Sequence, residues 1–116
     1  LKEHAEKYFF LEKSLMNCYY HMATVAKPKE NKANEISGVI HADNTSRVQI
    51  CTEDQLLGKI LKNLEEKNIY LLANTSFNIS SDPMVYDKED AYLAVERMGI
   101  NFLLTENGLY KKKWDF

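Results

Sequence analysis

Three segments of the chain carry apolar side chains three or four positions apart, which is the repeat of a helix that buries one face. These segments are residues 2–13, 56–67 and 88–98. Thr52 and Gln55 have the spacing of a capping box ahead of the second segment. Asp87 occupies the N-cap position of the third, and Gly99 follows where a left-handed residue often ends a helix. We therefore expect three amphipathic helices.

Short apolar runs between these helices predict strands. Residues 47–52 alternate between apolar and polar, so Val48 and Ile50 are expected to share a buried face. Asn107-Gly108 favours the positive φ angles of a tight hairpin turn. The other strands are expected at residues 18–26, 36–40, 69–73, 100–104 and 109–111. The run 69–73 is apolar enough for a central strand. This order predicts an α+β fold with an open twisted mixed sheet and flanking helices.

The composition fits one globular domain over residues 1–116, since 45% of the residues are apolar and 11% are aromatic. We interpret Cys18 and Cys51 as free thiols of a reducing compartment. The net charge of −2 provides no broad positive field, so we expect no nucleic-acid partner. There is no apolar run of about 20 residues and no signal peptide, so we expect a cytoplasmic protein without membrane contact.

The histidines do not form a metal-binding pattern. His4, His21 and His41 show neither i, i+4 spacing nor an accompanying pair of cysteines. We therefore predict no metal site within this chain.

A polar cluster directly follows the apolar run 69–73. Asn74, Thr75, Ser76 and Asn78 surround a single Phe77. Ligands tend to bind where buried strands end, because side chains converge there on a crevice. The alternative is a turn that caps itself through its Asn and Ser side chains.

Arg47 is the second candidate. The chain has only two arginines, and Arg97 falls in the last turn of a predicted helix, where a cation complements the helix dipole. Arg47 instead follows the polar run 41–46, which no core would require. A planar guanidinium suits bidentate binding of phosphate or carboxylate. We favour an anion site over the alternative, an ion pair between Arg47 and Asp43.

Two longer segments carry a resemblance to a known family. Residues 37–49 read S-G-V-I-H-A-D-N-T-S-R-V-Q, and residues 72–85 read L-A-N-T-S-F-N-I-S-S-D-P-M-V. Together with Asp90-Ala91 they resemble the C-terminal domain of the O-carbamoyltransferases, which place carbamoyl groups on nodulation factors and antibiotics. The N-T-S-F-N sequence about thirty residues after H-x-D-x-T-x-R-x-Q is a specific combination, and the likeness extends from residue 5 to residue 113.

The resemblance implies a two-domain bacterial transferase that acts in a biosynthetic pathway. In that family a YrdC-like C-terminal domain converts carbamoyl phosphate and ATP to carbamoyl-adenylate, releasing phosphate and pyrophosphate. An actin-like N-terminal domain, which holds a metal, then passes the carbamoyl group to a hydroxyl. This chain would be the activating, YrdC-like domain. Its Ser76-Phe77-Asn78 matches the S-x-N signature that binds the nucleotide and phosphoryl groups.

The residue types suit such a ligand. Carbamoyl phosphate presents a phosphoryl dianion and an amide, so its pocket needs a guanidinium, a hydroxyl donor and an amide. Arg47 and Ser76 are the expected catalytic residues, and Asn78 is an expected binding residue. Because a hydrogen bond to a charged group contributes about 1.5–3 kcal/mol and a neutral one about 1, Arg47 should dominate affinity. Secondary contacts are expected from Thr45 and Asn74, in a loop shaped by His41 and Asp43.

The chain departs from the family pattern at several points. Asn44 stands where the family usually has Gly, and Ser81-Asp82 stands where it has Gly-Glu before Pro. The family's basic phosphate-binding segment would precede Leu1, and the start at Leu rather than Met favours a piece of a longer polypeptide. We therefore expect this piece to fold and to bind phosphate-bearing ligands weakly, without completing carbamoyl transfer. The alternative is a non-catalytic nucleotide-binding or docking module of a larger protein.

Overall fold

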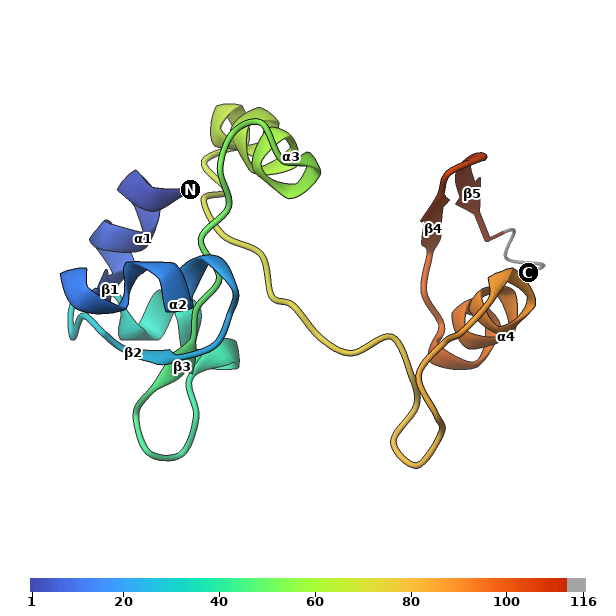
Figure 1. The fold of residues 1–116 in the computed structure, drawn as a ribbon, viewed down its shortest axis with the longest axis horizontal. Helices are drawn as coiled ribbons and strands as arrows, with labels where there is room; N and C mark the ends of the chain where they lie inside the picture. Colours follow the sequence, from blue (N-terminus) through green and yellow to red (C-terminus); the bar gives the residue numbers. More distant parts are fainter. Residues whose placement is uncertain (113–116) are drawn as a thin grey trace. The chain divides into compact units, whose positions relative to one another are not determined.

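A computed structural model describes residues 1–112, which form one compact unit over residues 1–73 and a second one that starts at residue 74. Lys113, where the family likeness ends, lies outside the described residues. The elements of the first unit are α1 (Lys2–Tyr8), β1 (Phe9–Phe10), η1 (Lys13–Leu15), α2 (Met16–Tyr20), β2 (Val25–Pro28), η2 (Ala33–Val39), β3 (Ser46–Arg47), α3 (Leu56–Leu64) and η3 (Glu65–Lys67) (Figure 1). Those of the second unit are α4 (Lys88–Met98), β4 (Phe102–Thr105) and β5 (Gly108–Lys111).

A small antiparallel sheet organises the first unit. Its strand order is β1-β2-β3, with Phe9 opposite Pro28 and Val25 opposite Arg47. Side chains alternate across a strand, and this sheet follows the rule at every position. The buried strand residues are Phe9, Ala26, Pro28 and Ser46, and the exposed ones are Phe10, Val25, Lys27 and Arg47. One face therefore belongs to the core, and the other, which we call the outer face, is open.

The core of the first unit lies under this sheet. Tyr19 and Ile50 are its most completely buried large side chains, each with 1% of its surface exposed. The buried members of the cluster are Tyr8, Phe9, Tyr19, Ala26, Ile36, Val48 and Ile50. Val48 and Ile50 are both buried as the alternating pattern predicts, although only Arg47 of residues 47–52 lies in a strand.

The strand expected at residues 18–26 is wrong in its first half. Residues 16–20 form α2, the chain turns at Met22 with a φ of 53°, and β2 begins only at Val25. The Tyr19 hydroxyl accepts a hydrogen bond from the Glu12 N–H at 3.4 Å. Aromatic residues favour strands only where they fit a pleated surface, and the burial of Tyr19 requires a helical turn instead.

Two other expectations in this unit need correction. The helix expected at 2–13 ends at Tyr8, because Phe9 and Phe10 pair with β2. The apolar piece 36–40 lies mostly in the 3-10 helix η2, where Ile36 is the buried residue. In both segments tertiary pairing and burial override the local apolar pattern.

The helix expected at residues 56–67 is confirmed as α3 followed by η3. The predicted capping box is wrong, because α3 begins at Leu56 with Gln55 as its N-cap and without a side-chain cap hydrogen bond. The Gln55 side-chain oxygen accepts from the Thr52 N–H at 3.1 Å and closes a turn before the helix. Leu61 is the buried leucine of the stripe and packs in a small cluster with Leu1 and Cys51. Gly58 is buried directly against the Thr52 carbonyl.

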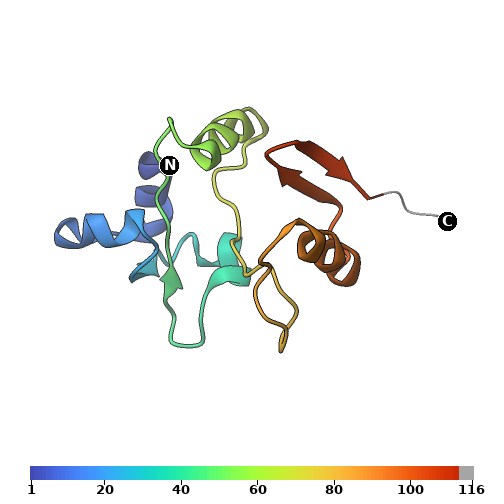
Figure 2. The ribbon, with the colours of Figure 1, turned by 45° about the vertical axis from the view of Figure 1, so that its right-hand side comes forward.

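The second unit agrees closely with the sequence pattern. The Asp87 carboxylate accepts from the Asp90 N–H at 2.9 Å at the start of α4, and Gly99 ends the helix with a φ of 66°. β4 and β5 pair as an antiparallel hairpin beside α4 (Figure 2). The buried cluster of this unit consists of Ala91, Val95 and Leu103. The predicted cap, helix end and hairpin are all confirmed.

The α+β class is confirmed, but the sheet differs from the expectation. All strand pairs in residues 1–112 are antiparallel, and they form a three-stranded and a two-stranded sheet in place of one open mixed sheet. The run 69–73, expected as a central strand, lies in no strand of the described chain, and Ile69 and Leu72 are exposed. An apolar run becomes a strand only where a partner supplies its ladder. No helix in the described residues is long and apolar enough to span a membrane.

Candidate functional site

Residues 41–45 form a tight loop that leads into β3. The His41 N–H donates to the Thr45 carbonyl at 2.7 Å, and the Asn44 N–H donates to the His41 carbonyl at 3.0 Å. Asn44 has a φ of 60°, so it adopts the left-handed conformation for which Gly and Asn are suited. The buried Ser46 hydroxyl donates to the Val39 carbonyl at 2.8 Å and anchors the end of the loop.

The Thr45 hydroxyl connects the two titratable side chains of this loop. It donates to Asp43 Oδ1 at 2.7 Å, and the Thr45 N–H donates to the same oxygen at 3.1 Å. Because the hydroxyl has only one proton, its 3.2 Å contact with His41 Nδ1 requires the imidazole to donate. A neutral His41 therefore keeps Nε2 as an acceptor.

Removing this hydroxyl should change how Asp43 titrates. The hydrogen bond from Thr45 is the largest influence on the Asp43 carboxyl and lowers its pKa below the ordinary value of 3.8. Thr45→Val should raise that pKa, which NMR titration of the carboxyl carbon measures directly. Because the native pKa is depressed, its stabilising contribution is present above pH 3.8 and is lost as the pH falls through the native pKa. An Asp43 pKa unchanged by Thr45→Val would contradict this network.

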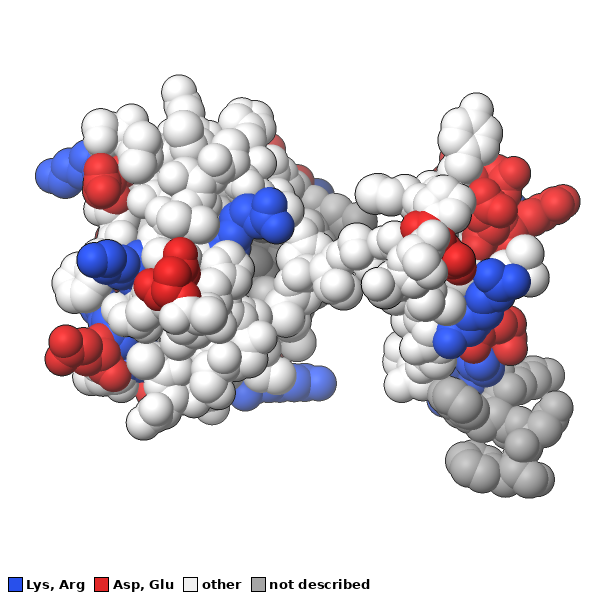
Figure 3. All heavy atoms as spheres, turned by 90° about the horizontal axis from the view of Figure 1, so that it is seen from below, with Lys and Arg blue, Asp and Glu red and all other residues white. Residues whose placement is uncertain are grey.

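Arg47 is exposed on the outer face and has no ion-pair or hydrogen-bond partner in residues 1–112. The alternative ion pair with Asp43 does not form, since that carboxylate accepts from Thr45. Arg97 instead contacts Asp82 Oδ2 at 3.2 Å. Lys and Arg side chains lie among Asp and Glu on the face seen from below, without one continuous positive patch (Figure 3). Arg47 is thus a local cation that is free to hold an anion.

The polar loop that follows residue 73 is organised by Asn78. Its amide nitrogen donates to the Asp82 carbonyl at 2.9 Å and to the Ile79 carbonyl at 3.3 Å. The Asp82 N–H also donates to the Ile79 carbonyl, at 2.9 Å. Asn78 therefore caps its own turn, as the alternative interpretation of this loop proposed. Ser76 and Asn74 are exposed on the same loop.

The carbonyl oxygen of Asn78 is left without a donor. Oδ1 is buried and no group of residues 1–112 hydrogen-bonds to it. The amide cannot be reversed, because its nitrogen faces two carbonyl oxygens. An unsatisfied buried acceptor costs about 1–3 kcal/mol. The neighbouring Ser76 is exposed, and its hydroxyl has no partner among the described residues.

Ser81 carries backbone strain in this loop. Its φ is 85°, at the position where the resembled family has Gly. The left-handed conformation costs a residue other than Gly about 1–2 kcal/mol. Replacement by Gly removes this cost, but the greater entropy of Gly in the unfolded chain offsets part of the gain in stability. Ser81→Gly should therefore stabilise the protein by about 0.5–1 kcal/mol in urea unfolding. Ser80→Gly is the control and should destabilise it, because Ser80 has no positive φ.

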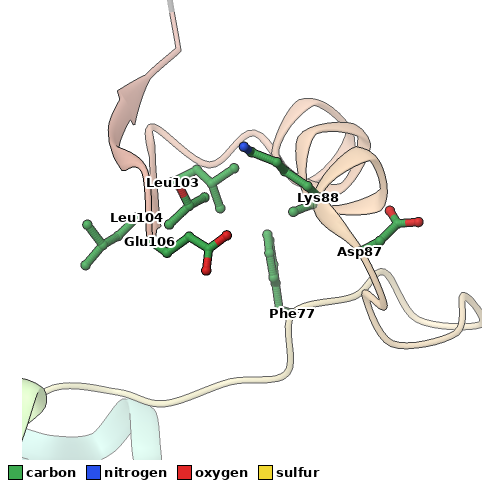
Figure 4. Close-up of a pocket in the computed structure, with 8 residues that line it drawn as sticks. Phe77, Asp87, Lys88, Leu103, Leu104 and Glu106 are labelled. Atoms are coloured by element: carbon green, nitrogen blue, oxygen red, sulfur yellow. The ribbon is translucent and has the colours of Figure 1, made fainter.

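A pocket of about 300 Å³ lies in the second unit, between α4 and the hairpin. Phe77, which lies between Ser76 and Asn78 in sequence, forms one wall of this pocket. The Glu106 side chain points toward the Phe77 ring, whereas the Asp87 side chain projects away from it (Figure 4). The remaining lining residues are Lys88, Ala91, Leu103, Leu104 and Thr105. Phe77 also packs against the buried cluster of this unit, and this contact holds the polar loop in place.

One group of potential metal ligands was not foreseen from the histidine spacing. Ligand atoms of Glu3, His4 and Glu65 all lie within 4.8 Å of one another. His4 Nε2 contacts Glu65 Oε1 at 2.8 Å, and Lys62 contacts the other Glu65 oxygen at 3.0 Å. His4 and Lys62 thus both contact the Glu65 carboxylate, and the His4–Glu65 contact links α1 to η3.

The expected site residues fall into two groups. The structure brings together His41, Asp43, Thr45 and Arg47 in one loop and strand. It places Asn74, Ser76 and Asn78 in one loop of the other unit. Each group has its own supporting core, and their action on a common ligand is a proposal.

Comparison with known proteins identifies the family. The family model described as Carbamoyltransferase C-terminus matches residues 1–112. Uncharacterized protein MJ1051 of Methanocaldococcus jannaschii is 36% identical over 110 residues, which are 90% of this chain and 21% of that protein. Nodulation protein NolNO of Sinorhizobium fredii is 28% identical over 116 residues, 97% of this chain and 17% of that protein. The chain thus spans about a fifth of the length of these relatives. It belongs to the carbamoyltransferase C-terminus family.

Proposed function

We propose that this chain is the part of a carbamoyltransferase that activates the carbamoyl group. Carbamoyl phosphate, ATP and water would give carbamoyl-adenylate, phosphate and pyrophosphate. An actin-like N-terminal domain with its own metal would then pass the carbamoyl group to a hydroxyl acceptor. The family match over residues 1–112 carries this proposal.

The chemistry of the two residue groups supports these roles. Arg47 is an exposed guanidinium without a partner in the described chain, and such a group can hold a phosphoryl dianion through two parallel hydrogen bonds. The Ser76 hydroxyl can donate to a phosphoryl oxygen. Asn78 Oδ1 lacks a donor, and the carbamoyl amide offers one. Because donors and acceptors match the two ends of carbamoyl phosphate, we assign catalysis to Arg47 and Ser76 and binding to Asn78.

The remaining expected residues have supporting roles in this proposal. Thr45 and Asn74 would add hydrogen bonds to the ligand. His41 and Asp43, fixed by the Thr45 hydroxyl, would hold the loop so that Arg47 leaves it in one orientation. A preorganised loop places charge without reorganisation when the reaction occurs.

A docking module is the second candidate function. The second unit exposes large apolar side chains, with Tyr86 93% and Met84 70% exposed. Such side chains are typical of surfaces that another domain covers. In that case the polar loops would have no part in turnover.

The test is carbamoyl-phosphate-dependent exchange of pyrophosphate into ATP, measured on residues 1–116 and on the full-length protein. We expect exchange by the full-length protein and little by the isolated chain. Omission of carbamoyl phosphate is the control and should abolish exchange. Strong exchange by residues 1–116 alone would refute the incompleteness of this piece, and none by the full-length protein would refute the proposed reaction.

A further inference from the structure

The outer face of the β1-β2-β3 sheet carries a second cation beside Arg47. Lys27 is exposed on this face, and neither cation has an ion-pair partner in residues 1–112. None of the residues in the three strands is acidic. Asp43 in the loop before β3 is already hydrogen-bonded to Thr45. The face therefore has positive charge that the described chain leaves uncompensated.

The strand register makes these cations neighbours. Arg47 lies opposite Val25, and Lys27 follows two residues later on the same side of β2. Diagonal neighbours on one sheet face are about 7–8 Å apart, which long side chains easily span. A row of phosphoryl groups can bridge two cations at this spacing, whereas one small anion is held more readily by the guanidinium alone.

Apolar side chains flank the two cations on this face. Val25 is 44% exposed and Phe10, opposite Lys27, is 61% exposed. Lys29 Nζ lies 5.7 Å from the centre of the Phe10 ring and donates to the Glu6 carbonyl at 2.6 Å. The face thus combines cations with exposed apolar side chains.

We propose that this outer face binds the polyphosphate chain of ATP, with Lys27 as a phosphate-binding cation next to Arg47. The nucleotide's identity rests on the proposed function, whereas the role of Lys27 comes from the register and charge of the sheet. The occupant is a polyanion rather than a protein surface, because Lys27, Lys29 and Arg47 all lie at this face and the three strands contain no acid for a mixed set of ion pairs.

The experiment uses the full-length protein. Lys27→Ala should raise the KM for ATP in the exchange assay by about tenfold or more, as expected for loss of a hydrogen bond to a charged group. The KM for carbamoyl phosphate and the kcat should stay close to wild type. Lys27→Arg should restore most of the affinity. Lys59→Ala, which removes an exposed lysine of α3, is the matched control and should leave both KM values unchanged.

Calorimetry with inorganic tripolyphosphate separates this inference from the proposed reaction. Lys27→Ala should weaken tripolyphosphate binding by a similar factor, Lys27→Glu should weaken it further, and added salt should reduce the difference. Tripolyphosphate affinity and KM for ATP both unchanged in a folded Lys27→Ala protein would overturn the inference. If the wild type fails to exchange but tripolyphosphate binding depends on Lys27, the carbamoyl reaction is refuted and the phosphate-binding face stands. Lys27→Gln replaces the alanine variant if the latter does not fold.

Discussion

Replacing Arg47 by alanine in the full-length protein is expected to lower the rate of carbamoyl-phosphate-dependent exchange by about 10²–10³-fold, by analogy with loss of an oxyanion donor. Arg47 has no internal partner in residues 1–112, so its removal leaves no buried charge behind. Arg47→Lys keeps the charge but loses the planar fork, so its rate should fall between wild type and Arg47→Ala. Initial rates of pyrophosphate exchange, measured for the wild type and both variants, test this order.

The other arginine provides the matched control. Arg97 forms an exposed ion pair with Asp82, and such pairs contribute about 0–1 kcal/mol. Arg97→Ala should therefore leave the exchange rate near wild type. Unfolding of Arg47→Ala should also stay within about 0.5 kcal/mol of wild type, because the side chain is exposed. A folded Arg47→Ala protein with full turnover would favour the docking module over the catalytic role.

Gly58→Ala is expected to destabilise the first unit by about 3 kcal/mol, at the upper end of what an overpacked site costs. A Cβ at this position would lie 1.9 Å from the Thr52 carbonyl oxygen and 2.7 Å from its carbon. These are backbone atoms, so no side-chain rotation can relieve the clash. The intrinsic gain of about 1 kcal/mol for alanine over glycine in a helix is too small to offset it. Urea unfolding measures the change.

Gly38→Ala is the control for this clash. A Cβ at Gly38 would meet nothing within 4 Å, and its φ is not positive. The substitution should therefore change the unfolding free energy by less than about 0.5 kcal/mol. Equal effects of the two substitutions would mean that α3 does not pack on the Thr52 carbonyl.

Elements with local signals at both ends were predicted well. α4 begins at the Asp87 cap and ends at the left-handed Gly99, and the hairpin turns at Asn107-Gly108. α3 follows the Thr52–Gln55 pair. Each of these signals acts within a few residues, so no knowledge of distant contacts was needed.

Elements defined by distant contacts were predicted poorly. The aromatic residues Tyr19 and Tyr20 were expected in a strand, yet α2 forms because Tyr19 fills the core beside Ile50. The run 69–73 read as a central strand but has no partner strand in the described chain. Lys27 was also missed, because the expected strand ended at residue 26 whereas β2 extends to Pro28, and its position on the outer face follows from the register of β2 with its neighbours.

Sequence alone established the family likeness, the cap and end of α4, the hairpin, and the two polar loops that carry the candidate site. These features depend on short-range chemistry, such as the left-handed conformation of Asn44 or the self-capping of Asn78. The Asp43–Thr45 hydrogen bonds that leave Arg47 free are also local, since they join residues two positions apart. Tertiary structure decided that Lys27 shares the open face of the sheet with Arg47. This outcome depends on strand register and burial, which bring together residues that are distant along the chain.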